Sequence, residues 1–143
     1  MARVVGIDHG DRRFGVAISD AGGVLASPRD VVPGEDALMR YLDRLVPEEE
    51  IGELVVGLPL NMDGSSGPRV KKVLAFCARL EQRFGLPVHT WDERLTSYQA
   101  EGLLVDAGIR GRKKKRKVDK VAAQLILQGW LDHRREETRT DRP

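Results

Sequence analysis

The sequence predicts an α/β fold in which helices flank one central mixed five-stranded sheet. Short apolar runs separated by turn-forming residues fill the first quarter of the chain. Segments with apolar residues at helical spacing follow, and they alternate with two further apolar runs. The 143 residues suit one domain with a sizeable core, and a hydrophobic content of 41% is ordinary for a globular protein.

Three strands are expected at the start of the chain, over residues 3–8, 14–19 and 24–32. The intervening segments 10–12 and 20–23 are rich in glycine and aspartate, which favour tight reversals. The first part of the sheet is therefore expected to be an antiparallel three-stranded meander.

Helices and parallel strands are expected to alternate in the middle of the chain. A helix over 36–45, closed by Pro47, leads to a strand over 53–60. This strand is continuously apolar, as expected for a central parallel strand covered on both faces. A second helix runs from Pro68 to Phe84, with Pro68 at a favourable first position and Gly85 as its cap. The fifth strand covers 86–92.

Two more helices are expected after the last strand. Thr96 to Gln99 has capping-box spacing and starts a helix that reaches Gly108. The basic segment that follows is expected to be a loop, and a final helix covers about 118–133. Residues 136–143 have no apolar anchor and are expected to be a disordered tail. A meander followed by right-handed α/β crossovers is the order that an RNase H-like domain requires.

Positive charge is concentrated in one segment. Residues 110–120 read RGRKKKRKVDK, with eight basic residues and one acid. The rest of the chain has 24 − 8 = 16 basic and 22 − 1 = 21 acidic residues, a net charge of −5. This asymmetry indicates a polyanionic partner, although such runs also occur as solvated loops and targeting tracts.

Acidic residues stand where the predicted strands end. Asp8 ends the first strand, Asp92 and Glu93 end the last, and Asp119 lies in the first turn of the final helix. Ligands of open α/β sheets bind beyond the carboxyl ends of parallel strands, so these carboxylates can converge at one edge. Converging carboxylates need cations between them, and a pair of hard cations can drive phosphoryl displacement.

Each acid also has a purely structural explanation. Asp8 could stabilise its glycine-containing turn, Asp119 could complement a helix dipole, and Glu93 could pair with Arg94. In the usual strand order, the strand over 53–60 would separate the first and last strands. Asp92 and Asp63 therefore remain alternatives to Glu93, which ranks first.

The cysteine, the histidines and the length of the apolar stretches indicate which metal ion and which cellular compartment to expect. Cys77 is the only cysteine and falls at helical spacing among apolar residues, so a buried structural thiol is expected. The three histidines are scattered, which favours an oxygen-ligated Mg²⁺ or Mn²⁺ over zinc. No apolar stretch is long enough for a membrane span or a signal peptide, so the expected location is the cytoplasm.

Four stretches resemble the family of bacterial Holliday-junction-resolvase-like proteins that are also described as pre-16S rRNA nucleases. They are GIDHGDRRFGVAISD at 6–20, VVGLPLNMDGSSG at 55–67, DERLTS at 92–97 and KVDKVAAQLILQGWLD at 117–132. The resemblance implies a single RNase H-like nuclease domain over residues 1–135, with Asp8, Glu93 and Asp119 as the catalytic, metal-binding acids. Asp92 is a further candidate metal ligand. His9 stands where the family pattern has an aromatic or aliphatic residue.

The basic segment borders Asp119, which makes it the expected phosphate-binding surface. The candidate nucleic-acid-binding residues are Arg112, Lys113, Lys114, Lys115, Arg116 and Lys117, with Arg94, Lys71 and Lys72 as an extension. The resemblance implies processing of the 5′ end of pre-16S rRNA, with structured RNA and a pre-ribosomal particle as partners. No membrane partner is expected, and monomer and homodimer both remain open.

Three other functions remain in competition. A Holliday junction resolvase that cuts branched DNA would use the same metal chemistry. A non-catalytic RNA-binding assembly factor could keep the acids without cleaving. A sugar-kinase or actin-like nucleotide-binding domain has a similar first loop, but it needs two such domains to clamp its nucleotide.

Overall fold

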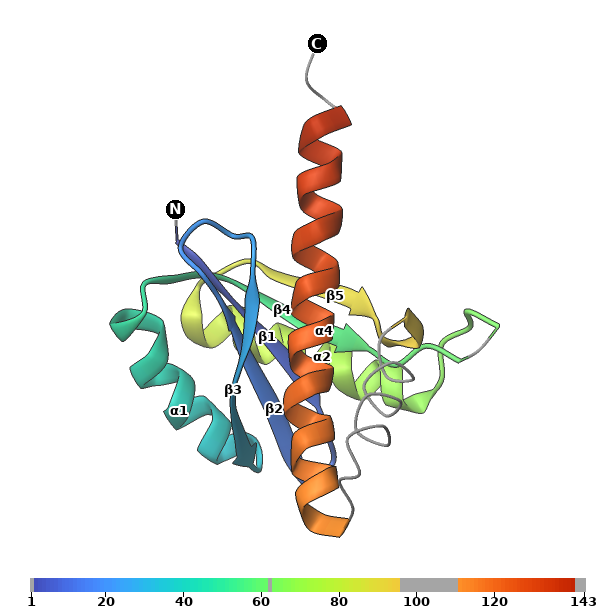
Figure 1. The fold of residues 1–143 in the computed structure, drawn as a ribbon. Helices are drawn as coiled ribbons and strands as arrows, with labels where there is room; N and C mark the ends of the chain where they lie inside the picture. The colour runs from blue at the N-terminus through green and yellow to red at the C-terminus, as the bar shows by residue number, and fades with distance from the viewer. Residues whose placement is uncertain (1, 62, 96–110, 141–143) are drawn as a thin grey trace.

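The computed structural model describes residues 2–61, 63–95 and 111–140, with the backbone alone for Leu95, 111–120 and 139–140. Five strands and three α-helices make up these ranges (Figure 1). In chain order they are β1 (Arg3–His9), β2 (Arg13–Ser19), β3 (Ala26–Pro33), α1 (Glu35–Glu48), β4 (Ile51–Leu58), α2 (Pro68–Phe84), β5 (Val88–Asp92), the 3₁₀ turn η1 (Glu93–Leu95) and α4 (Gly111–Thr140).

All five strands join one mixed sheet in the order β3-β2-β1-β4-β5. β2 pairs antiparallel with both β1 and β3, which forms the meander expected from the sequence. β1, β4 and β5 run parallel to one another. The predicted five-stranded mixed sheet is therefore confirmed, and β4 lies between the two strands that end in acids.

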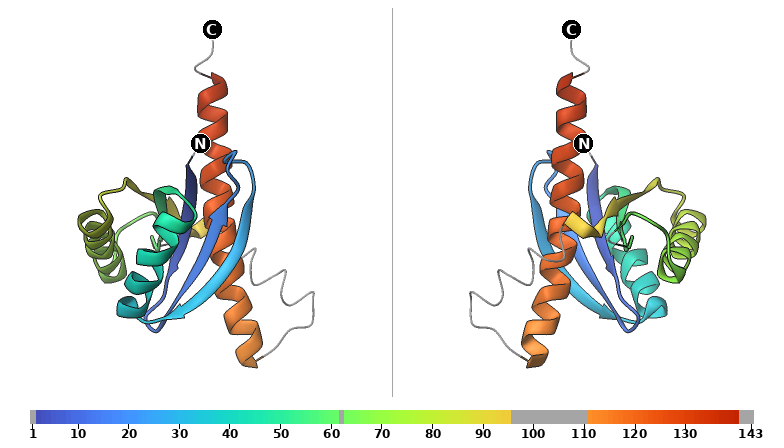
Figure 2. Two further views of the ribbon diagram at one scale, coloured as in Figure 1. Left: turned by 90° about the vertical axis from the view of Figure 1, so that its left-hand side faces the viewer. Right: turned by 90° about the vertical axis from the view of Figure 1, so that its right-hand side faces the viewer.

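Helices cover both faces of the sheet (Figure 2). α1 and α2 pack on one face over a core that includes Val5, Ile7, Leu42 and Phe76. Of the described helices, α4 covers the other face, where Ala123, Ile126, Leu127 and Leu131 pack against smaller side chains of the sheet. None of the helices described is long and apolar enough to cross a membrane.

Contacts along α4 fix its position on the sheet. A Cβ atom at Gly6 would lie 2.6 Å from Leu127 Cβ, so the helix approaches β1 as closely as glycine allows. Gln128 Oε1 accepts a hydrogen bond from the Ala26 amide at 2.9 Å. Further along the helix, Arg134 donates to Glu53 of β4 at 2.7 Å. The helix is thereby tied to β1, β3 and β4 between Leu127 and Arg134.

The ends of α2 match the sequence pattern. Pro68 occupies the first turn, where its missing amide hydrogen costs no helical hydrogen bond. Gly85 adopts a left-handed conformation with φ 64° and donates its amide to the Glu81 carbonyl.

Several predicted boundaries were wrong. α1 continues past Pro47 to Glu48, because the proline removes only its own amide hydrogen bond and the Glu49 amide still donates to the Leu45 carbonyl at 2.9 Å. The predicted basic loop is helical from Gly111 onward, which agrees with the high helix propensity of lysine and arginine. α4 also continues to Thr140, beyond the start of the predicted tail at residue 136. The predicted helix over 96–108 lies outside the described residues.

Candidate functional site

The side chains of Asp8 and Glu93 meet at the carboxyl ends of the parallel strands. Asp8 is the next-to-last residue of β1, and Glu93 opens the 3₁₀ turn that follows β5. The two side chains share a hydrogen bond. The sheet order thus brings together two of the three acids expected from the sequence, even though β4 separates their strands.

A glycine in β4 opens the path between these strands. Ile7 pairs with Val56 and Gly57 pairs with Trp91, so Gly57 lies between the ends of β1 and β5. A Cβ atom at Gly57 would lie 2.7 Å from Glu93 Cγ. Gly57 was not among the residues predicted from the sequence, although a glycine within the apolar run 53–60 signals a close approach.

Burial and the neighbouring acid both act on Asp8. Desolvation raises the pKa of the Asp8 carboxyl well above its ordinary value, and the hydrogen bond and negative charge of Glu93 raise it further. The Arg69 guanidinium opposes this effect. A desolvated carboxyl group hydrogen-bonded to a second acid is an oxygen donor set that a hard divalent cation fits, because the cation would offset the charge that burial disfavours on Asp8.

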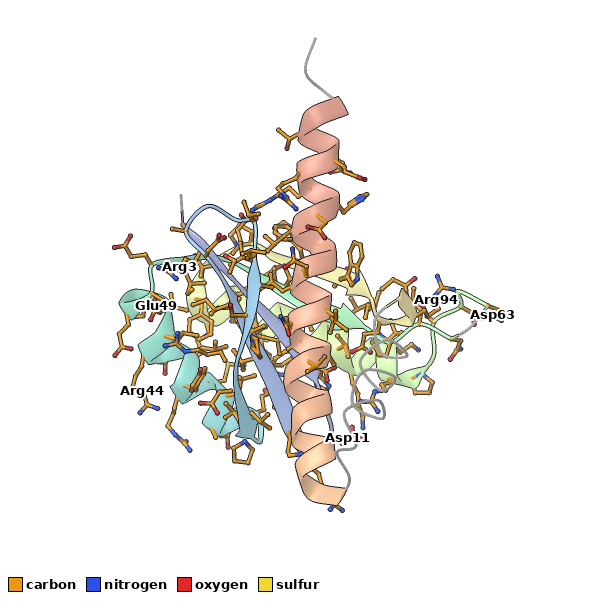
Figure 3. The ribbon with its side chains drawn as sticks, in the orientation of Figure 1. Arg3, Asp11, Arg44, Glu49, Asp63 and Arg94 are labelled. Carbon is orange, nitrogen blue, oxygen red and sulfur yellow. The ribbon has the colours of Figure 1, made fainter. Side chains whose placement is uncertain are left out.

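Asp92 and Asp63 are engaged elsewhere. Asp92 accepts hydrogen bonds from the Arg94 backbone amide at 3.0 Å and from Arg94 Nε at 2.9 and 3.0 Å. These bonds lower the pKa of the Asp92 carboxyl. Asp63 accepts from the Ser65 amide and hydroxyl at 2.9 and 2.6 Å. Figure 3 shows Asp63 and Arg94 close together at one end of the sheet.

The third predicted acid, Asp119, lies in α4, but its side chain is outside the described part of the structure. Within the described side chains, no group of three or more histidine, cysteine, aspartate or glutamate residues is placed to hold a metal ion. Of the three predicted acids, Asp8 and Glu93 are therefore the two whose side chains the described structure brings together.

Arg69 is a cation near the acids that the sequence analysis did not select. It is the second residue of α2, and its Nη2 donates to the His9 carbonyl at 3.2 Å. Its Nη1 lies 3.8 Å from Asp11 Oδ2. Lys71 and Lys72 follow in the same helix turn and are exposed. Three cations thus start the helix beside the end of β1, where the helix dipole does not favour positive charge.

His9 faces the opposite side of the sheet from Asp8. Its ring packs edge-on against Phe14 and Phe76, with centroid distances of 5.1 and 5.0 Å. Burial, with the nearby Arg69 charge, lowers the pKa of the imidazole. His9 is therefore half-buried against aromatic residues of the core, which explains how a histidine can stand where the family pattern has an apolar residue.

Cys77 is buried in α2, as expected from the sequence. Burial raises the pKa of its thiol to about 11, so the thiol is protonated at neutral pH. A nucleophilic role for this cysteine has no support in its surroundings.

Solved structures that resemble this chain show the same fold. The structure titled "T. thermophilus RuvC in complex with Holliday junction substrate" superimposes with a TM-score of 0.57 at 15% identity, covering 94% of this chain and 96% of that one. The yeast mitochondrial Holliday junction resolvase Ydc2 gives a TM-score of 0.51 at 13% identity, covering 97% and 84%. The predicted RNase H-like architecture is therefore confirmed.

Sequence relatives are much more similar. A protein of Halothermothrix orenii named "Putative pre-16S rRNA nuclease" is 44% identical over 135 residues, covering 92% of this chain and 95% of its own length. A Ligilactobacillus salivarius protein with the same name is 47% identical over 137 residues, covering 92% and 93%. The RuvX family model, described as Holliday junction resolvase, matches residues 2–133. The chain belongs to the RuvX family.

Proposed function

We propose that this chain is a divalent-metal-dependent nuclease that hydrolyses phosphodiester bonds in structured RNA, at the 5′ end of pre-16S rRNA. The observation that carries the proposal is the pairing of Asp8 with Glu93 at the carboxyl edge of the sheet. A metal-dependent nuclease needs carboxylates held close together despite their repulsion, and perturbed carboxyl groups cluster at functional sites.

Asp8, Glu93 and Asp119 are the residues proposed to hold Mg²⁺ or Mn²⁺. When bound, the cation lowers the pKa of a coordinated water and stabilises charge on the leaving oxygen. The protein supplies a partly desolvated edge in which Asp8 and Glu93 are already aligned. Asp92 is a weaker candidate ligand, because Arg94 already occupies its carboxylate.

The register of α4 supports Asp119 as the third acid. The Ala123 carbonyl lies beside Gly6, and Asp119 is one helical turn before Ala123 on the same face. Asp8 is two residues after Gly6, also on the same face. α4 begins near the end of β1 (Figure 1). The step from Ala123 back to Asp119 and the step from Gly6 on to Asp8 therefore lead toward the same edge of the sheet. The helix step is about 6 Å and the strand step about 7 Å, and these similar lengths support Asp119 as a neighbour of Asp8.

The basic start of α4 is proposed to bind substrate phosphates. Its residues are Arg112, Lys113, Lys114, Lys115, Arg116 and Lys117. They occupy consecutive helical positions, and a step of about 100° per residue distributes their charge around the helix. Lys71, Lys72 and Arg69 of α2 are proposed as further phosphate contacts, and the Arg69 charge already acts on Asp8. Arg94 forms an ion pair with Asp92, so it would contact substrate while still paired with that carboxylate.

RNA is the proposed substrate because the more similar relatives are named for pre-16S rRNA. A pre-ribosomal particle and a cytoplasmic location follow from that substrate. The alternative is a resolvase acting on branched DNA, favoured by the family description and by the structural neighbours. A resolvase is expected to act as a two-fold dimer that makes paired cuts on a symmetric junction.

The test compares cleavage and binding on both substrates. Purified protein is incubated with a pre-16S rRNA 5′ fragment and with a synthetic four-way DNA junction, in Mg²⁺, Mn²⁺ or EDTA. Metal-dependent RNA cleavage that Asp8→Asn abolishes is the expected result. Cleavage of the junction alone would favour the resolvase function. Tight RNA binding without cleavage of either substrate would identify a non-catalytic assembly factor.

A further inference from the structure

Of the two glycines in β4, Gly57 is the one that lies against Glu93. It is next to last in β4, between β1, which carries Asp8, and β5, which Glu93 directly follows. Its backbone is not among the left-handed glycines, so an alanine could adopt its conformation. The reason for a glycine at this position must therefore be the limited space around it, not its backbone conformation.

On the α4 face of the sheet there is no room for a side chain at position 57. An alanine Cβ at position 57 would lie 2.7 Å from Glu93 Cγ and 2.8 Å from Glu93 Oε1. Contacts below 3.0 Å are essentially never seen for real Cβ atoms. Cγ is in the middle of the glutamate side chain, so moving it also moves the carboxylate. The Glu93 side chain thus lies directly over the Gly57 backbone.

This position explains how Glu93 reaches its partner. Asp8 lies on the same sheet face as Gly6, which contacts α4. Adjacent strands are about 4.8 Å apart, so Glu93 must cross the full width of β4 to meet Asp8. Any side chain at position 57 would stand in that path.

We propose that Gly57 is a positioning residue of the metal site, whose missing side chain lets Glu93 lie across β4 and pair with Asp8. It touches neither substrate nor metal and acts through Glu93. The assignment rests on the proposed function only where it links this pairing to metal binding.

A packing role is the competing explanation. The same alanine Cβ would lie 2.6 Å from Ile126 Cδ1, so Gly57 could serve only to admit α4. One atom, Ile126 Cδ1, distinguishes the two explanations. Ile126→Val removes Cδ1 and relieves the helix contact, while the conflict with Glu93 remains.

The experiment compares Gly57→Ala, Ile126→Val and the double variant with the wild-type chain. Gly52→Ala is the matched control, because it adds the same methyl group to the other end of β4, against exposed Ala2. Mn²⁺ affinity is measured by titration calorimetry, and stability without metal by thermal unfolding in EDTA.

The expected result is a loss of Mn²⁺ affinity of roughly tenfold or more in both proteins that carry Gly57→Ala, as for other residues that orient metal ligands. The double variant should recover most of the unfolding temperature lost by Gly57→Ala. Gly52→Ala should bind Mn²⁺ as the wild type does. Recovery of Mn²⁺ affinity in the double variant would assign Gly57 to helix packing and overturn the proposal.

A second readout needs neither metal nor activity. Asp8→Asn and Glu93→Gln are combined in a double-mutant cycle of unfolding temperature. The cycle is measured once in the wild-type background and once in the background that carries both Gly57→Ala and Ile126→Val. Coupling between positions 8 and 93 is expected only in the wild-type background. Equal coupling in the two backgrounds, or none in either, would overturn the proposal. The nuclease function could fail its own test, with no cleavage of any substrate, while this coupling is still observed.

Discussion

The carboxyl groups of Asp8 and Glu93 share a hydrogen bond across the end of β4. Burial and the second acid both disfavour an ionised Asp8, so both raise the pKa of its carboxyl group. Such an arrangement reduces the stability of the metal-free fold near neutral pH. Functional sites commonly reduce stability in this way.

Asp8→Asn should therefore stabilise the metal-free protein at neutral pH while abolishing cleavage. The folded state raises the Asp8 pKa, so it holds a proton that the unfolded chain loses above about pH 4. Wild-type stability thus falls as pH rises from there through the folded pKa. Asparagine cannot ionise and avoids this loss. Thermal unfolding in EDTA should show an advantage for the variant that grows with pH.

Asp63→Asn is a control for which the opposite change in stability with pH is expected. Hydrogen bonds from Ser65 lower the Asp63 pKa, so its carboxylate adds stability above the unfolded pKa and loses that effect in acid. This variant should be less stable than wild type at neutral pH and equal to it in acid. An Asp8→Asn protein that is destabilised at neutral pH would contradict the assigned environment of Asp8.

Metal binding should release a proton and strengthen with pH. A ligating carboxylate must be deprotonated, and Asp8 keeps its proton to a higher pH than an ordinary aspartate. The apparent Mg²⁺ or Mn²⁺ affinity should rise by up to about tenfold per pH unit below the Asp8 pKa and then level off. Calorimetry in two buffers of different ionisation enthalpy measures the released proton. A flat profile from about pH 5 to 8, with no proton release, would exclude Asp8 as a ligand.

Most of the fold could be predicted from local pattern. The ends of α2 follow from Pro68 and Gly85, and the meander from its turn residues. The basic segment could not be assigned in this way. Lysine and arginine are good helix formers, yet consecutive like charges repel, so the pattern 112–117 is compatible with helix and loop. The structure resolves this conflict by continuing α4 to Gly111.

The site was harder to predict than the fold. Asp8 stands out as an acid that ends a buried strand, whereas the choice among Glu93, Asp92 and Asp63 depended on which could cross β4. Only the three-dimensional neighbours of Gly57 show the path that Glu93 takes. Arg69 could not be predicted from the sequence for a similar reason, because its contact with the His9 carbonyl joins segments far apart in the sequence.

Glu93→Gln and Asp92→Asn should have different effects despite being neighbours. Glu93→Gln removes a proposed ligand and should lower Mn²⁺ affinity by more than roughly tenfold. Asp92→Asn breaks an ion pair with Arg94 and should leave Mn²⁺ affinity little changed. Calorimetric titration of both variants checks this. Equal losses in the two proteins would show that Asp92 leaves Arg94 to bind the metal.

Neutralising the basic start of α4 should weaken substrate binding and reduce its dependence on salt. Lys113, Lys114 and Lys115 are replaced together by glutamine, which preserves helix propensity. Each lost phosphate contact should reduce the slope of log affinity against log salt by about 0.7 to 0.9. The control replaces Arg40 and Arg44, exposed on α1 at the opposite side of the molecule from Arg94 (Figure 3). Binding is measured by fluorescence anisotropy with Asp8→Asn in every protein. An unchanged slope in the lysine variant, or an equal fall in the arginine control, would show that α4 is not the phosphate-binding surface.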